Sequence, residues 1–134
     1  MKRNLIFIGI LFFIVSNLFA QSETLQYSGE IGSLPITMNL TYTFVKKYKC
    51  KEYTEYSGYY YYNKYKKSIS ISGSFNPCGV GGGDPNKAIF LSETSEGLNT
   101  GAFELYCVTC DKMTGFWESP DGKKKLKVTL TKVK

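Results

Sequence analysis

Short runs in which apolar and polar residues alternate recur along most of the chain. The clearest run covers 36–44, where Ile36, Met38 and Leu40 alternate with threonines and an asparagine. Alternation with a period of two residues is typical of a β-strand that is buried on one face. The pattern predicts strands at 24–31, 36–44, 53–63, 69–75, 87–93, 103–107, 114–118 and 126–130.

Short turns separate these expected strands, and no window has convincing helical periodicity. The turns fall at 32–33, 63–66, 95–100 and 119–122, while 46–56 stays open between strand and a helical turn. We therefore expect an all-β fold, an up-and-down antiparallel meander of about eight strands that closes into a small barrel. Closure is favoured because it removes exposed sheet edges. A two-sheet sandwich is the alternative, since turn lengths alone do not separate the two.

The N-terminal segment has the layout of an export signal. Lys2 and Arg3 precede an apolar stretch over 5–15, and 18–20 offers a cleavage site. The stretch is shorter than the roughly 20 residues of a membrane span. We expect a cleaved signal peptide over 1–20, a single β-barrel domain over 21–134, and a periplasmic or extracellular location. An uncleaved anchor is the alternative.

The net charge excludes few classes of function, but it gives no support to nucleic-acid binding. Without residues 1–20 the chain has 15 Lys, no Arg and 11 acidic residues, a net charge of +4. Such a small excess gives no strong reason to invoke a polyanion, and Arg is the usual residue for bidentate phosphate recognition. We expect no nucleic-acid partner and no stable membrane insertion of the mature chain. The oligomeric state stays open.

Aromatic and glycine patterns carry a resemblance to known proteins. The segments 58–62, 69–73, 91–93 and 115–117, which read Gly-Tyr-Tyr-Tyr-Tyr, Ile-Ser-Ile-Ser-Gly, Leu-Ser-Glu and Gly-Phe-Trp, resemble a group of small exported bacterial β-proteins of uncharacterised function. The layout is also similar to the avidin and lipocalin style of eight-stranded meander. That resemblance implies a barrel fold, and it assigns no ligand residues to this chain.

The four cysteines are expected to gather at one end of the barrel. Cys50, Cys78, Cys107 and Cys110 fall in or beside every second loop, and alternate loops of an up-and-down barrel lie at the same end. An exported chain meets an oxidising compartment, which favours disulfides. We favour Cys50–Cys78 with Cys107–Cys110, and the other pairings stay open. A zinc site is the alternative, since Cys107 and Cys110 have ligand spacing, but the chain has no His.

One carboxylate is predicted to point into the barrel. Glu93 has the same parity as Leu91, and an inward carboxylate costs free energy unless it is hydrogen-bonded or paired. Strand direction places Tyr62 and Trp117 toward the same end, with Tyr60 one layer deeper. We predict a ligand-binding site of Glu93, Trp117, Tyr60 and Tyr62 at the end opposite the cysteines. The alternatives are a Glu93 that reaches water at the rim and an interior filled with side chains.

Function is predicted only as a class. The absence of His removes the Ser-His and Cys-His nucleophile systems, so we expect no enzyme, no catalytic residue, no metal and no cofactor. The leading hypothesis is an exported, non-catalytic binding or interaction module for a small molecule, a glycan or a protein. A periplasmic lysozyme-type inhibitor is an alternative, because Ser57-Gly58-Tyr59-Tyr60-Tyr61 resembles the Ser-Gly-x-x-Tyr motif of such inhibitors. A small carboxylate-based hydrolase is the third hypothesis.

Overall fold

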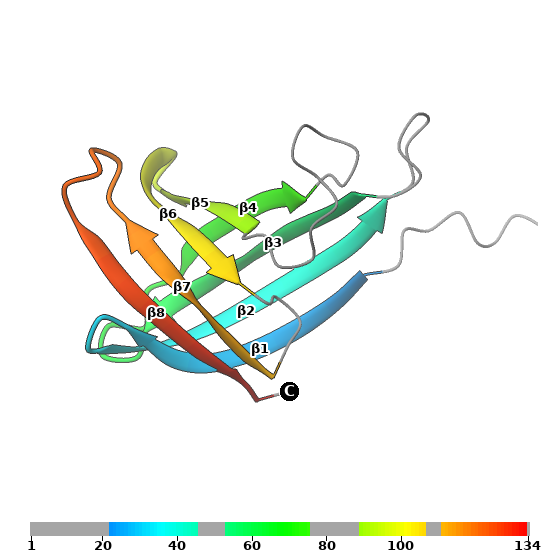
Figure 1. The fold of residues 1–134 in the computed structure, drawn as a ribbon, viewed down its shortest axis with the longest axis horizontal. Coiled ribbons are helices and arrows are strands. Elements are labelled where there is room, and N and C mark those ends of the chain that lie inside the picture. Colours follow the sequence, from blue (N-terminus) through cyan, green and yellow to red (C-terminus); the bar gives the residue numbers. More distant parts are fainter. Residues whose placement is uncertain (1–21, 46–52, 76–88, 107–110, 134) are drawn as a thin grey trace, which may run out of the picture.

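Eight antiparallel strands form a closed up-and-down barrel in this computed structural model (Figure 1). The structure describes residues 22–45, 53–75, 89–106 and 111–133. The ladder between the first and last strands closes the barrel, with Ile31 opposite Val128. The barrel prediction is therefore confirmed over the sandwich. The strands are β1 (Ser22–Ile31), β2 (Leu34–Val45), β3 (Tyr53–Tyr62), β4 (Ile69–Phe75), β5 (Ile89–Ser95), β6 (Leu98–Tyr106), β7 (Lys112–Glu118) and β8 (Lys125–Lys132).

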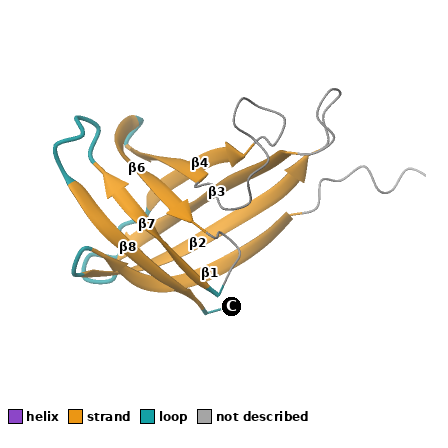
Figure 2. Cartoon of the chain, viewed as in Figure 1, coloured by secondary structure: helices purple, strands orange, loops and turns teal. Residues whose placement is uncertain are grey.

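Strand is the one regular element that the described residues form (Figure 2). Within these residues there is no helix long and apolar enough to cross a membrane. The open segment 46–56 is settled in part, because 53–56 belongs to β3. The export signal at 1–20, the rest of that open segment and all four cysteines lie outside the described residues.

The hairpin between β5 and β6 corrects one expected turn. The loop expected over 95–100 is reduced to Glu96 and Gly97, and β6 already begins at Leu98. Both central residues have positive φ, 53° and 78°, as a type I′ turn requires. This tight turn matches the right-handed twist of the flanking strands, so pairing continues to within two residues of the reversal.

The four turns that join β1 to β2, β3 to β4, β5 to β6 and β7 to β8 lie together at one end of the barrel, on the left in Figure 1. We call this the hairpin end. The strand ends that flank 46–52, 76–88 and 107–110 lie at the opposite end. The expected gathering of the cysteines at that opposite end stays a prediction.

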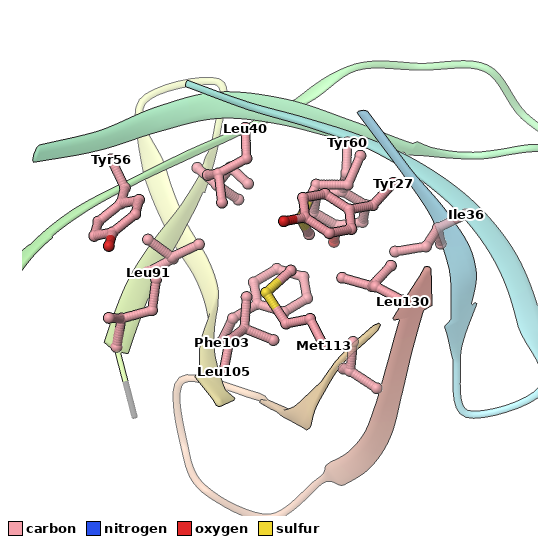
Figure 3. Close-up of a cluster of buried hydrophobic side chains, with 14 of the residues drawn as sticks. Tyr27, Ile36, Leu40, Tyr56, Tyr60, Leu91, Phe103, Leu105, Met113 and Leu130 are labelled. Carbon is pink, nitrogen blue, oxygen red and sulfur yellow. The ribbon is translucent and has the colours of Figure 1, made fainter. Parts of the chain in front are cut away.

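The barrel interior is occupied by buried apolar side chains, several of which are drawn in Figure 3. An eight-stranded barrel is just wide enough for side chains to fill it. Strands approach closely at four inward glycines, where a Cβ would lie 1.9–2.2 Å from a carbonyl oxygen of the neighbouring strand: Gly29, Gly58, Gly73 and Gly115. The core members are Leu25, Tyr27, Ile31, Ile36, Met38, Leu40, Tyr56, Tyr60, Ile71, Ile89, Leu91, Phe103, Leu105, Met113, Val128 and Leu130.

Candidate functional site

Glu93 is the one charged side chain that is buried among the described residues, with 4% of its surface exposed. It stands near the end of β5 on the same inward face as Leu91. β5 runs toward the hairpin end, so Glu93 lies between the apolar core and the hairpin end of the barrel. The predicted inward direction is confirmed, and the alternative of a rim carboxylate in water is wrong.

Three hydrogen-bond donors converge on the Glu93 carboxylate. The Tyr60 hydroxyl donates to Oε2 at 2.5 Å, and the Trp117 indole N–H donates to the same oxygen at 2.7 Å. The Thr100 hydroxyl donates to Oε1 at 2.7 Å. These donors come from β3, β7 and β6, so one carboxylate on β5 ties together side chains of four strands. Hydrogen bonds to a carboxylate are among the stronger ones in proteins, and here they offset the cost of burying it.

A β-bulge brings Thr100 into this group. Glu93 lies opposite Gly101 and Thr94 lies opposite Asn99, so Thr100 is an extra residue on β6. In a regular ladder Thr100 would have the outward parity of Ala102, and the extra residue re-aims its side chain. The Asn99 side-chain oxygen accepts a hydrogen bond from the Gly101 backbone N–H at 3.0 Å. This bond satisfies a donor where the regular ladder is interrupted.

Gly101 lets the indole of Trp117 lie against the strand. A Cβ at this position would stand 2.5 Å from Trp117 Nε1 and less than 3 Å from two ring carbons. Only a residue without a side chain therefore fits beneath the ring. The contact holds the indole on the β6 backbone directly beside Glu93, which fixes the direction of its N–H.

Tyr60 and Tyr62 form the aromatic side of the site. The Tyr60 ring packs edge-on against Phe103 at 5.2 Å and against Tyr62 at 5.8 Å between ring centroids. Burial, and then the hydrogen bond to Glu93, raises the pKa of Tyr60 far above its ordinary value. Burial also raises the pKa of Tyr62, partly opposed by its hydrogen bond with Tyr60. Both phenols thus stay protonated at neutral pH, and Tyr60 serves as a donor and not as a base.

An incompletely covered set of apolar side chains lies at the hairpin end, on the inward face of the strands. Leu34 is 49% exposed and Leu98 is 70% exposed. Both have inward parity, because Leu34 lies opposite buried Ile31 and Leu98 opposite Ser95, two residues beyond Glu93. The other members are partly buried and pack on the core. We call this set the apolar rim: Leu34, Tyr62, Ile69, Leu98, Trp117 and Leu126.

The four predicted site residues come together as expected from strand direction and parity. Glu93 contacts Tyr60 and Trp117 directly, and Tyr62 joins through Tyr60. Sequence reasoning missed Thr100 and Gly101, because a bulge leaves no mark in a two-residue alternation. It also missed the rim leucines, although an apolar residue directly after the Glu96-Gly97 turn is an unusual turn neighbour.

The described residues do not show the features that a lysozyme-type inhibitor or a carboxylate-based hydrolase would require. Ser57 lies in the middle of β3, with its side chain on the outer surface, and not in a protruding loop. The described hydrogen-bond partners of Glu93 are two hydroxyls and an indole N–H, not a second carboxylate. Nor do three or more potential metal ligands come together within the described ranges.

Comparison with known proteins adds no family to this picture: no family model, no curated protein and no solved structure matches the chain. The up-and-down order of eight strands is consistent with the avidin and lipocalin style of meander at the level of fold.

Proposed function

We propose that the chain is an exported, non-catalytic binding module whose hairpin end binds a small apolar molecule. The observation that carries this proposal is the apolar rim, where inward-facing side chains remain exposed beside a buried carboxylate. Small-molecule sites are mostly apolar and contain a few fixed polar groups. Because the barrel interior beneath is filled, the ligand would lie on the rim and not in the centre.

The site residues divide into two roles under this proposal. Trp117 and Tyr62 are partly exposed and contact the ligand, together with Leu34 and Leu98. Glu93 is too deeply buried and too fully hydrogen-bonded to be the main contact, so it and Tyr60 act as positioning residues for Trp117. A ligand that carries a hydrogen-bond donor gains a further contact if it reaches Glu93 Oε1, for which one donor is described.

The single tryptophan makes the test direct. Trp117 is the only Trp of the chain and belongs to the rim. We expect a neutral apolar dye such as N-phenyl-1-naphthylamine to bind, quench Trp117 emission and gain fluorescence of its own. Apolar compounds with an amine or hydroxyl group should displace the dye.

Two exposed apolar residues provide a matched pair of variants. Leu98 belongs to the rim, whereas Phe90 is 64% exposed on the outer surface of β5. Leu98→Ser should weaken dye binding, and Phe90→Ser should leave it unchanged. Equal loss in the two variants, or no saturable binding by the wild-type protein, would contradict the proposal.

A further inference from the structure

The outer surface of β1 to β4 has an unusual composition. In the central rows of these four strands every outward position holds an uncharged polar residue or a tyrosine. We call this surface the hydroxyl face: Thr24, Gln26 and Ser28 on β1, Thr37, Asn39 and Thr41 on β2, Ser57, Tyr59 and Tyr61 on β3, and Ser70 and Ser72 on β4.

These residues form regular rows across the sheet. One row runs from Thr24 through Thr41 and Ser57 to Ser72, and the next contains Asn39, Tyr59 and Ser70. Neighbouring strands are about 5 Å apart, and same-face residues along a strand are about 7 Å apart. The face therefore presents a grid of hydrogen-bonding groups with a spacing comparable to the size of a sugar ring.

Two tyrosines stand within this grid. Tyr59 is 42% exposed and lies opposite Asn39 on one side and Ser70 on the other. Tyr61 lies opposite Thr37 and is partly exposed. Each aromatic ring is thus flanked by groups that can both donate and accept hydrogen bonds.

The lack of charge limits the partner. An ordinary soluble surface is about a quarter to a third charged, whereas none of these eleven positions is charged. Charges border the face at its ends, with Glu30 and Glu55 on the strands and Lys64, Lys66 and Lys67 in the turn that follows Tyr61. Within the central rows, a phosphate, a carboxylate or a polybasic segment would find no counter-charge. Hydroxyls, amides and tyrosine rings suit a ligand that is itself neutral, rich in hydroxyls and lined with C–H groups.

We propose that the hydroxyl face binds a neutral polysaccharide. Sugar hydroxyls pair with the Ser, Thr, Asn and Gln side chains, and the C–H faces of sugar rings pack on Tyr59 and Tyr61. Tyrosine with small polar residues is also the composition of surfaces that adapt to many partners at a low entropic cost. This site is independent of the apolar rim, which faces the inside of the barrel.

Retention on insoluble polysaccharides tests this proposal. The purified protein is mixed with cellulose, mannan and starch particles, and the retained fraction is measured at low and high salt. We expect retention on at least one of them, unchanged by salt because no ion pairs are involved. Carboxymethyl cellulose is the charged comparison, and it is used at high salt because it attracts a chain with a net charge of +4 at low salt. Under that condition it should bind the protein no better than cellulose does.

Variants on the two faces of the molecule complete the test. Tyr59→Ala and Tyr61→Ala should each weaken retention about tenfold, the loss expected of a central aromatic contact. Phe116→Ala, on the outer surface of β7, is the matched control and should bind as the wild type does. Dye binding at the rim should be unaffected by all three, which separates this proposal from the previous one.

Three results would overturn the proposal. They are no retention on any neutral polysaccharide, retention that falls with salt, and equal loss in Phe116→Ala. A fourth result would assign the face to a protein partner instead. In that case the wild type binds no polysaccharide but captures another protein stably, and Tyr59→Ala abolishes the capture.

Discussion

At the scale of single residues, the molecule is organised around a buried carboxylate. Glu93 is kept out of water, yet it accepts hydrogen bonds from Tyr60, Thr100 and Trp117. Leaving any of these groups buried without a partner would cost about 1–3 kcal/mol. The side chain is therefore both a structural centre and the group that fixes the only tryptophan.

Replacing Glu93 by Gln should lower the free energy of unfolding by about 1–3 kcal/mol. The amide oxygen accepts the hydrogen bonds from Tyr60 and Trp117 more weakly than a carboxylate does. The amide N–H₂ is a donor, so the Thr100 hydroxyl must accept a hydrogen bond from it instead of donating one. Denaturant unfolding measures the loss. Glu104→Gln is the control, because Glu104 accepts a Tyr106 hydroxyl on the outer surface. An equal effect in both variants would contradict a special role for Glu93.

Alkaline pH should destabilise the barrel through its buried phenols. The folded-state pKa of Tyr60 is raised, chiefly by burial, above the value of about 10 for an unfolded chain. Above about pH 10 the unfolded chain loses this proton while the folded chain still holds it. The free energy of unfolding is therefore unaffected by the phenol below about pH 10 and falls above it, by about 1.4 kcal/mol per pH unit for each such phenol.

The pH dependence of unfolding in Tyr60→Phe tests this origin. The free energy of unfolding is measured with denaturant at several pH values above about 10 and plotted against pH. Its decrease with pH should be less steep for Tyr60→Phe than for the wild type, whereas Tyr61→Phe, on the outer surface, should decrease as the wild type does. Identical slopes in all three proteins would show that Tyr60 is not the source.

At the scale of elements, the strand β6 determines how the site is built. Its bulge turns Thr100 inward, and the following Gly101 leaves room for the indole. Most strands and their inward faces could be predicted because alternation reports directly on burial. The bulge could not, because it changes the register by one residue without changing the composition of the strand.

Gly101→Ala should displace Trp117 from Glu93. The added Cβ would lie within 3 Å of three indole atoms, so the ring has to move outward. We expect a red-shifted Trp117 emission together with lower stability. Gly97→Ala is the control, because it adds a strained residue at φ 78° with nothing within 4 Å of the new Cβ. It should lower stability without the spectral shift, and a shift in both variants would contradict the close packing.

At the scale of the whole molecule, the two barrel ends differ. The hairpin end contains the apolar rim and the Glu93 group, while the opposite end is flanked by the segments that contain the cysteines. The alternation of inward and outward positions, together with strand direction, sufficed to predict that Glu93, Tyr60 and Trp117 lie at one end. They could not supply the hydrogen-bond pattern, because the choice of donor depends on side-chain angles and on the bulge.

In the exported chain that we propose, the cysteines should form two disulfides and leave no free thiol. The strand ends that flank their segments lie at one end of the barrel, which allows all four to meet there. Thiol titration of the denatured, unreduced protein should find no reactive groups. Two or more reactive thiols per chain would contradict the disulfide prediction and revive metal binding.

Glu93 lies inside the barrel and accepts a hydrogen bond from the indole N–H of Trp117. Because the chain has one Trp, its indole N–H gives one identifiable resonance in a ¹H–¹⁵N NMR spectrum. We predict a signal that is shifted downfield and exchanges slowly with solvent in the wild type, and that moves and exchanges faster in Glu93→Gln but not in Glu104→Gln. An indole N–H that exchanges freely in the wild-type protein, or whose signal is unchanged in Glu93→Gln, would contradict this hydrogen bond.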